Sequence, residues 1–236
     1  MIGILGKKLG MTRIYDEAGK VNPVTVVESG PCTVVNVRTM ERDGYSAVQL
    51  GHCEVDEKKL RKPIRGYLKK AGVPPVKYLR EIRLNEKADC KVGDKVTVDI
   101  FRPGDFVDVT GNSIGKGFQG GMKRWHWKGG PKSRGSTSHR RPGSIGSSTS
   151  PGRVWRGHHL PGRMGNERVT VQNLRVLKVD LQNNLLVLKG AVAGCDGRLL
   201  IIRKSKKRVW RPLTPPAPVK SKETKPVREA AKKTKK

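Results

Sequence analysis

The sequence contains the segment Leu174-Arg-Val-Leu-Lys-Val-Asp180, then the polar run Gln182-Asn-Asn184, and then the segment Leu185-Leu-Val-Leu-Lys189. Apolar residues stand at alternate positions in these segments, as Leu174 and Val176 do, and this is the spacing of a half-buried strand. Asn-rich runs favour tight turns because the short amide side chain can hydrogen-bond to nearby backbone. The stretch therefore predicts two strands joined by a turn.

Similar short segments occur along most of the chain, rich in Val, Ile and Leu and bounded by turn-forming residues such as Asp43-Gly44 and Cys195-Asp-Gly197. They predict further strands over Val24–Val27, Thr33–Arg38, Ala47–Gly51, Tyr78–Leu84, Lys95–Phe101, Val107–Thr110, Arg168–Val171 and Leu199–Arg203. One helix is expected over Ile64–Ala71, because Pro63 suits the start of a helix and Gly72 suits its C-terminal cap.

Two of the expected strands, Val107–Thr110 and Arg168–Val171, stand on either side of a long basic segment, residues 111–167. Strands on both sides favour a closed sheet from which this segment protrudes as an arm. The predicted fold is therefore mainly β. It is a closed β-barrel body formed by residues 1–110 and 168–203, with a small helical insertion at about residues 56–75.

The charge of the chain is high and uneven. The 236 residues include 50 Lys and Arg against 20 Asp and Glu, a formal net charge of +30, and 35% of the residues are hydrophobic. Residues 111–168 hold 12 Lys and Arg with one acid, and residues 203–236 hold 14 with two acids. Such a chain repels itself, so a polyanionic partner is expected. The Pro- and Lys-rich tail, residues 204–236, is predicted to be disordered in the free state.

Several classes of protein are disfavoured. No apolar run approaches the roughly 18 residues needed to span a bilayer, so no membrane partner is expected. The start of the chain, Met1-Ile-Gly-Ile-Leu-Gly-Lys-Lys8, is too short and interrupted for a signal peptide. The four cysteines stand far apart without a Cys-x-x-Cys pair, which favours free thiols in a reducing cytoplasm over disulfides or a zinc site: Cys32, Cys53, Cys90 and Cys195.

The arm, residues 111–167, cannot supply the core of a second domain. The span 111–168 contains 14 Gly and ten Ser or Thr but four aliphatic residues, so it is either functional or a flexible basic linker. A generic linker is not interleaved with Trp125, Trp127 and Trp155. Arg and Lys neutralise phosphates, Gly allows close backbone approach, and Trp and His stack on unpaired bases. The composition therefore favours an arm embedded in RNA.

Sequence support for catalysis is lacking. The run Gly115-Lys-Gly-Phe-Gln-Gly120 has the spacing of a dinucleotide-binding loop, but it has no βαβ context or nearby acid, and the following residues are unfavourable to a helix. The residues from Gly111 to Lys116 also depart from the phosphate-binding loop pattern. Ser147-Ser-Thr-Ser150 has no acid close in sequence to orient a histidine. The five histidines show no metal-ligand spacing: His52, His126, His139, His158 and His159. We expect no cofactor, no metal and no small-molecule substrate.

Four ordered stretches resemble the bacterial ribosomal protein L3 family of the large subunit, over about residues 1–203. The first is the signature from Phe101 through Asp108-Val-Thr-Gly-Asn-Ser-Ile-Gly-Lys-Gly-Phe-Gln-Gly-Gly-Met-Lys-Arg124. The others are Met1-Ile-Gly-Ile-Leu-Gly-Lys-Lys-Leu-Gly-Met-Thr-Arg-Ile-Tyr15, Ser138-His-Arg-Arg-Pro-Gly-Ser-Ile-Gly146 and Pro161-Gly-Arg-Met-Gly-Asn-Glu-Arg-Val-Thr-Val-Gln172. They resemble the family's N-terminus, its arm tip and the return of the arm into the barrel.

The resemblance implies a non-catalytic protein with a translation-protein type of β-barrel at the ribosome surface. Its arm would run through large-subunit rRNA towards the peptidyl-transferase centre, and the protein would act early in assembly near the 3′ end of that rRNA. Neighbouring large-subunit proteins would be further partners. Many relatives carry a methylated Gln at the arm tip where this chain has Thr149, so amide methylation is not expected. The residues after about 204 extend beyond the usual end of the family.

The candidate rRNA-binding residues are the cations, aromatic residues and tip glycines of the arm, together with three cations near the N-terminus. They are Lys7, Lys8, Arg13, Lys116, Lys123, Arg124, Trp125, His126, Trp127, Lys128, Lys132, Arg134, His139, Arg140, Arg141, Gly143, Gly146, Arg153, Trp155, Arg156, His158, Arg163 and Arg168.

Two other classes share part of this pattern. A DNA-compacting protein would have the same charge and Lys-rich tail, but such proteins are usually dimeric or helical and lack a single Gly- and Trp-rich arm. An RNA-modifying enzyme would need a cofactor pocket, for which the sequence gives no signature.

Overall fold

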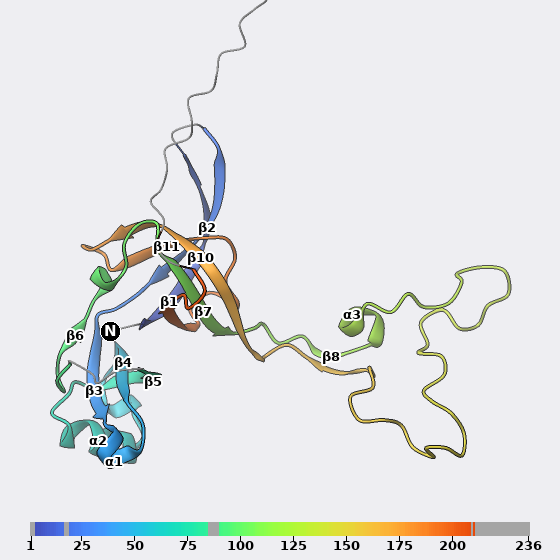
Figure 1. Cartoon of the computed structure of the whole chain (residues 1–236), viewed down its shortest axis with the longest axis horizontal. Helices are drawn as coiled ribbons and strands as arrows, with labels where there is room; N and C mark the ends of the chain where they lie inside the picture. Colours follow the sequence, from blue (N-terminus) through green and yellow to red (C-terminus); the bar gives the residue numbers. More distant parts are fainter. Residues whose placement is uncertain (1–2, 17–18, 85–89, 209, 211–236) are drawn as a thin grey trace, which may run out of the picture.

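The computed structural model describes residues 3–16, 19–84, 90–208 and 210. Six strands close into a barrel in the order β1-β12-β7-β10-β11-β2, with every neighbouring pair antiparallel (Figure 1). The strands are β1 (Gly3–Tyr15), β2 (Val21–Glu28), β7 (Phe106–Asn112), β10 (Arg168–Asp180), β11 (Leu185–Lys189) and β12 (Leu199–Lys204). The expected mainly β fold with a closed barrel is confirmed.

The barrel interior follows from strand alternation. In β7, Val107, Val109 and Gly111 are buried while the residues between them face outward. A side chain at Gly111 would meet a methyl of Leu200 at 2.7 Å and the carbonyl oxygen of Ala193 at 3.0 Å. Glycine is therefore required there by close packing, just before the arm begins.

A second sheet lies against the barrel and shares its hydrophobic core. Its strand order is β5-β4-β3-β6. The strands are β3 (Cys32–Arg38), β4 (Ala47–Glu54), β5 (Val76–Arg83) and β6 (Lys95–Val96). Beside them lie α1 (Met40–Asp43), the 3₁₀ turns Glu57–Lys59 and Val98–Ile100, and α2 (Lys62–Lys70). In α2, Leu68 is the one buried residue, and it packs with Val35, Val73 and Val76. The expected helix is present within two residues of its predicted bounds.

The sequence did not separate these two sheets, and some local expectations were wrong. Of the strand expected over Lys95–Phe101, only Lys95–Val96 pairs, and Val98–Ile100 form a 3₁₀ turn. Arg168–Val171 and Leu174–Asp180 are one strand, because an irregularity between Val171 and Leu174 shifts the register without ending the pairing.

Close packing explains two further differences from the predicted strands, one in β11 and one in β1. The predicted alternation in Leu185–Lys189 is absent, since Leu186, Val187 and Leu188 are all buried. The 13-residue strand β1 was not expected, because its glycines weaken strand propensity. At Gly6 a side chain would lie 2.9 Å from the carbonyl oxygen of Glu28, so the close approach of β2 requires the glycine.

The expected disordered tail, residues 204–236, falls mostly outside the described residues. Lys204 ends β12, and the part of the tail after it that the structure describes is residues 205–208 and Trp210. The indole N–H of Trp210 donates to the carbonyl oxygen of Pro103 at 3.1 Å. Among the described helices, none is long and apolar enough to cross a membrane.

Candidate nucleic-acid interface

The arm leaves the barrel at the end of β7 and returns at the start of β10, where Asn112 and Arg168 are register partners. Figure 1 shows the outgoing and returning segments side by side near the barrel and a wide loop beyond them. Short strands β8 (Gly117–Gln119) and β9 (Gly162–Met164) pair along this stem. The arm therefore has a base built by backbone pairing, although it has no core of its own.

Backbone contacts between the two segments fix the base of the arm. The Ser113 N–H donates to the Glu167 carbonyl oxygen, and the Lys116 N–H donates to that of Met164, both at 2.9 Å. Gly165 adopts φ +74, and a side chain there would collide with the carbonyl oxygen of Ile114. Glycine at this position therefore allows the outgoing and returning segments of the arm to lie in close contact.

A five-residue helix, α3 (Gly121–Trp125), carries an aromatic clamp across the stem. The indole of Trp125 stacks on the imidazole of His159, with ring centroids 4.1 Å apart and an interplanar angle of 7°. The Leu160 carbonyl oxygen accepts hydrogen bonds from the Trp125 indole and the Arg124 guanidinium, each at 2.9 Å. The Arg124 guanidinium also lies 4.9 Å from the centroid of the Trp125 ring. Trp125 and Arg124 therefore organise the arm itself.

The helix α3 corrects one expectation, that the residues after Gly115–Gly120 would not be helical. Gly121 is buried because the ring of Trp127 occupies the space where a side chain would stand. This single turn has no preceding parallel βαβ unit, so a dinucleotide site gains no support from it. Among the described residues, no three His, Cys, Asp or Glu side chains gather where they could hold a metal ion.

The loop beyond the clamp contains a small hollow with aromatic walls. It is lined by Trp127, Pro142, Ser144, Gly157, His158 and His159. Trp127 is half-buried, whereas Trp155 is 63% exposed and has the Arg153 guanidinium 5.4 Å from its ring centroid. The hollow and the exposed ring of Trp155 are two places in the arm where a planar ring could stack.

At the tip of the arm, Gly143 has φ +78 and Gly146 has φ +155, in the left-handed half of backbone space that favours glycine. No other part of the described chain comes within 4 Å of a side-chain position at either residue. Arg140 and Arg141 are exposed beside them. The tip therefore presents cations and bare backbone to its surroundings.

Most of the predicted contact residues are exposed, but the structure brings only part of them together. Lys7, Arg124 and Trp127 are half-buried and Lys8 is buried. The exposed members are Arg13 on β1, Arg168 at the stem, and Lys116, Lys123, Trp125, His126, Lys128, Lys132, Arg134, His139, Arg140, Arg141, Gly143, Gly146, Arg153, Trp155, Arg156, His158 and Arg163 in the arm. His159, Leu160 and Gly121 were not among the predicted residues, because their roles depend on contacts within the arm that no local sequence pattern signals.

Lys8 has a structural role. Its ammonium donates to the carbonyl oxygens of Gly194 at 2.8 Å and Val192 at 3.2 Å, and Asp196 lies 3.9 Å away. Lys8 is 7% exposed as a whole residue, and its side chain ties β1 to the loop before β12. We therefore leave Lys8 out of the proposed interface.

Comparison with known proteins identifies the family of this chain. Residues 83–184 match the family described as ribosomal protein L3. The chain is also 54% identical over 205 residues to the large ribosomal subunit protein uL3 of Carboxydothermus hydrogenoformans, which covers 87% of this chain and 98% of that protein. The chain belongs to the ribosomal protein L3 family.

Further members of the family are similarly close. The uL3 protein of Corynebacterium jeikeium is 53% identical over 206 residues, covering 87% of this chain and 94% of its own length. That of Thermosynechococcus vestitus is 50% identical over 205 residues, covering 87% and 97%. Members of the L3 family are structural proteins of the large ribosomal subunit.

Proposed function

We propose that this L3-family protein binds large-subunit rRNA directly, helps to nucleate early assembly of the subunit near the rRNA 3′ end, and uses its arm to buttress rRNA near the peptidyl-transferase centre. It performs no catalysis and acts in the cytoplasm within the large subunit, beside neighbouring ribosomal proteins. The observation that carries this proposal is the division of the arm into a self-supported stem and a tip, around Gly143 and Gly146, against which no distant part of the described chain packs.

The stem gives the arm a defined direction. Backbone hydrogen bonds from Ser113 to Glu167 and from Lys116 to Met164, together with the stacking of Trp125 on His159, hold the two segments together without any partner. The chain therefore does not have to order this part when it binds, which lowers the entropic cost of association.

The outer loop has the opposite property. Between Gly130 and the hollow near His158, cations such as Arg134, Arg140 and Arg141 are exposed. Phosphate groups would neutralise these cations, and an unpaired base could enter the aromatic hollow beside Trp127. The loop would thus take its final shape from the folded rRNA around it.

Competition binding tests the proposal. Full-length protein should prefer a transcript of the 3′-terminal region of large-subunit rRNA over duplex DNA of equal length, measured at fixed salt. A preference for duplex DNA would favour the DNA-compacting class instead. Large subunits purified from cells should retain the protein through a high-salt wash. Its release at the salt concentration that removes diffusely bound basic proteins would contradict a structural role.

A further inference from the structure

A continuous groove runs along the outside of the barrel, away from the arm tip. Its floor is the outer face of β12, β7 and β10, and its opposite wall is β5, the edge strand of the second sheet. Two adjoining hollows make up the groove and share Thr110, Arg168, Ile201 and Arg203. Apart from Arg168, no residue of this surface was predicted to bind rRNA.

The floor of the groove follows from the strand register. Ile201 pairs with Thr110, which pairs with Thr170, so the three side chains form one row across the outer face. The hydroxyl oxygens of Thr110 and Thr170 lie 2.9 Å apart. The row is uncharged and built from small or branched side chains, with the cations placed around it.

Arginines from both sheets line the groove. Arg80 and Arg83 come from β5, while Arg198 and Arg203 come from β12 and the turn before it. Within the described part of the chain, none of these four makes an ion pair with a carboxylate. Arg80 donates to the carbonyl oxygen of its neighbour Leu79 at 3.2 Å, a bond it can release at little cost because it is exposed.

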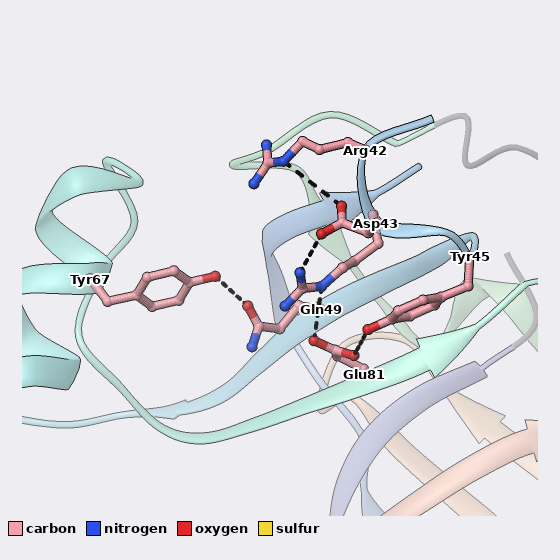
Figure 2. A network of polar contacts seen from close by, with 7 residues as sticks. Arg42, Asp43, Tyr45, Gln49, Tyr67 and Glu81 are labelled. Atoms are coloured by element: carbon pink, nitrogen blue, oxygen red, sulfur yellow. Dashed lines mark hydrogen bonds and ion pairs between the residues drawn. The ribbon is translucent and has the colours of Figure 1, made fainter. Parts of the chain in front are cut away.

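The acids that line the groove are already engaged. The Glu81 carboxylate accepts a hydrogen bond from the Tyr45 hydroxyl at 3.0 Å and another from the Arg38 guanidinium at 3.3 Å. Figure 2 shows the Tyr45–Glu81 contact within the polar network of the second sheet. Tyr45 also lies beneath the Arg83 guanidinium, 4.9 Å from ring centroid to Cζ. The Tyr45 side chain therefore hydrogen-bonds one carboxylate of the groove, Glu81, and packs against one of its cations, Arg83.

The second acid is held in the same way. The Asp108 carboxylate accepts a hydrogen bond from the Asn173 N–H at 2.8 Å, which ties it to β10. Seven cations line the groove against these two carboxylates, so its charge is strongly positive and is carried mainly by arginines: Arg80, Arg83, Arg168, Arg198, Arg203, Lys204 and Lys206. Guanidinium groups are suited to phosphate because their planar donors match its oxygens.

We propose that this groove binds the phosphate backbone of folded rRNA as a second contact surface, independent of the arm. Tyr78 is its one aromatic lining residue, so the groove offers little surface for base stacking. It would recognise the charge and shape of the rRNA backbone. This inference rests on the proposed function, because it takes rRNA as the partner. It adds that the body of the protein anchors to RNA without the arm.

A matched pair of full-length variants tests the groove. The triple variant R80Q/R198Q/R203Q removes three groove cations, and the control R61Q/K62Q/K70Q removes three exposed cations on or beside α2 that make no ion pair in the described structure. Affinity for a transcript of the 3′-terminal region of large-subunit rRNA is measured from 0.05 to about 0.3 M salt. Each lost phosphate contact lowers the slope of log affinity against log salt by about 0.7–0.9.

The groove variant should lose about 2 to 3 units of slope, and its affinity should fall more than about tenfold at low salt. The control should stay within about half a unit of the wild type. An unchanged slope in the groove variant, or an equal loss in the control, would overturn the inference. If wild-type protein fails to prefer rRNA over duplex DNA, the proposed function fails first, so the two failures are distinguishable.

A second measurement covers the case in which Arg203, which is half-buried, affects folding. Arginines of wild-type protein are modified with phenylglyoxal with and without the same transcript, and the modified peptides are identified by mass spectrometry. Arg80 and Arg198 should be protected by rRNA, and Arg61 should remain reactive. Equal modification of Arg80, Arg198 and Arg61 in the complex would contradict a phosphate contact in the groove.

Discussion

The indole of Trp125 lies flat on the imidazole of His159, 4.1 Å between ring centroids and 7° from parallel. The two residues belong to opposite segments of the arm, and their contact closes the stem where the outer loop begins. Sequence composition alone favours Trp125 as a base-stacking residue, yet its ring packs against His159 within the protein. The position of the loop relative to the barrel therefore depends on this pair.

Replacing His159 by Ala should loosen the stem without unfolding the body. Stacked aromatic pairs contribute about 0.5–1.5 kcal/mol beyond their buried area, so the local opening of the stem should become roughly 2- to 12-fold more frequent. Hydrogen exchange of the Lys116 and Arg124 amides would report it. The matched control is His158→Ala, which removes the adjacent imidazole. Equal exchange in both variants would show that the stacking does not hold the stem.

Lys8→Met should destabilise the barrel and leave rRNA binding almost unchanged. The substitution leaves the Val192 and Gly194 carbonyl oxygens without their charged donor, which costs about 2–4 kcal/mol. Urea unfolding measures the loss, with Lys7→Met as the control. If Lys8→Met instead lowers the salt dependence of rRNA binding at full stability, the ammonium contacts phosphate.

His52 predicts a loss of stability in mild acid. It is 5% exposed on β4, with its Nδ1 3.7 Å from the Sγ of Cys32. Burial lowers the pKa of His52 below its usual value, and burial raises the pKa of the Cys32 thiol to about 12. The unfolded chain therefore binds a proton on this histidine at a higher pH than the folded protein does.

The sign follows from proton linkage. Below about pH 6.5 the unfolded state binds more protons, so the free energy of unfolding falls with decreasing pH by up to about 1.4 kcal/mol per unit, until the folded histidine also titrates. Urea unfolding of wild type and His52→Gln between pH 7.5 and 5 should give curves that converge as the pH falls. Parallel curves would mean that His52 titrates alike in both states.

Much of the fold could be predicted because its barrel strands obey local rules. Val107 and Val109 alternate with outward-facing residues, and the turn at Gln182–Asn184 has its expected form, with Asp180 accepting backbone N–H groups at 3.1 and 3.3 Å. The division of the strands into two sheets could not be predicted, since β3 and β4 have the same composition as barrel strands. Their assignment depends on long-range pairing.

The site was predictable in kind but not in detail. Clustered cations and glycines indicate a nucleic-acid arm whatever its geometry, because charge and backbone freedom are properties of composition. Contacts between residues more than 30 positions apart, as between Trp125 and Leu160, decide whether an aromatic ring packs within the protein or stays exposed for stacking on a base. The groove arginines Arg80 and Arg198 were missed for the same reason, since they lie on different sheets.

The barrel should fold without its arm. Asn112 and Arg168 are register partners, so a short Gly-Ser turn can replace residues 113–167 and convert β7 and β10 into a hairpin. The apolar core lies in the body, and we expect a single cooperative thermal transition by circular dichroism. A broad transition without cooperativity would show that the arm contributes to the core. If the groove binds RNA as proposed, this shortened protein should also retain salt-dependent affinity for rRNA.

The arm tip should tolerate little change at Gly143 or Gly146. Both have positive φ, and a β-branched residue is strongly disfavoured there, by about 1–2 kcal/mol from the backbone alone. The described chain leaves open space around both positions, so collision adds nothing and Gly143→Val and Gly146→Val should lower the stability of the isolated protein by no more than this backbone cost. Within the large subunit, both the altered backbone and the added bulk would displace the rRNA that the tip is proposed to buttress.

Bulk affinity for rRNA should change less than about twofold in either variant, because most of the +30 net charge lies elsewhere. Maturation of large subunits, peptide-bond formation or sensitivity to drugs that act at the peptidyl-transferase centre should shift instead. Ser147→Val is the control, since it adds comparable bulk at a neighbouring residue whose φ is not positive. Normal maturation, peptide-bond formation and drug response in both glycine variants would refute the placement of the tip. A defect equal to theirs in Ser147→Val would trace the effect to bulk, whereas a smaller one would identify the glycine conformation as the property that rRNA packing requires.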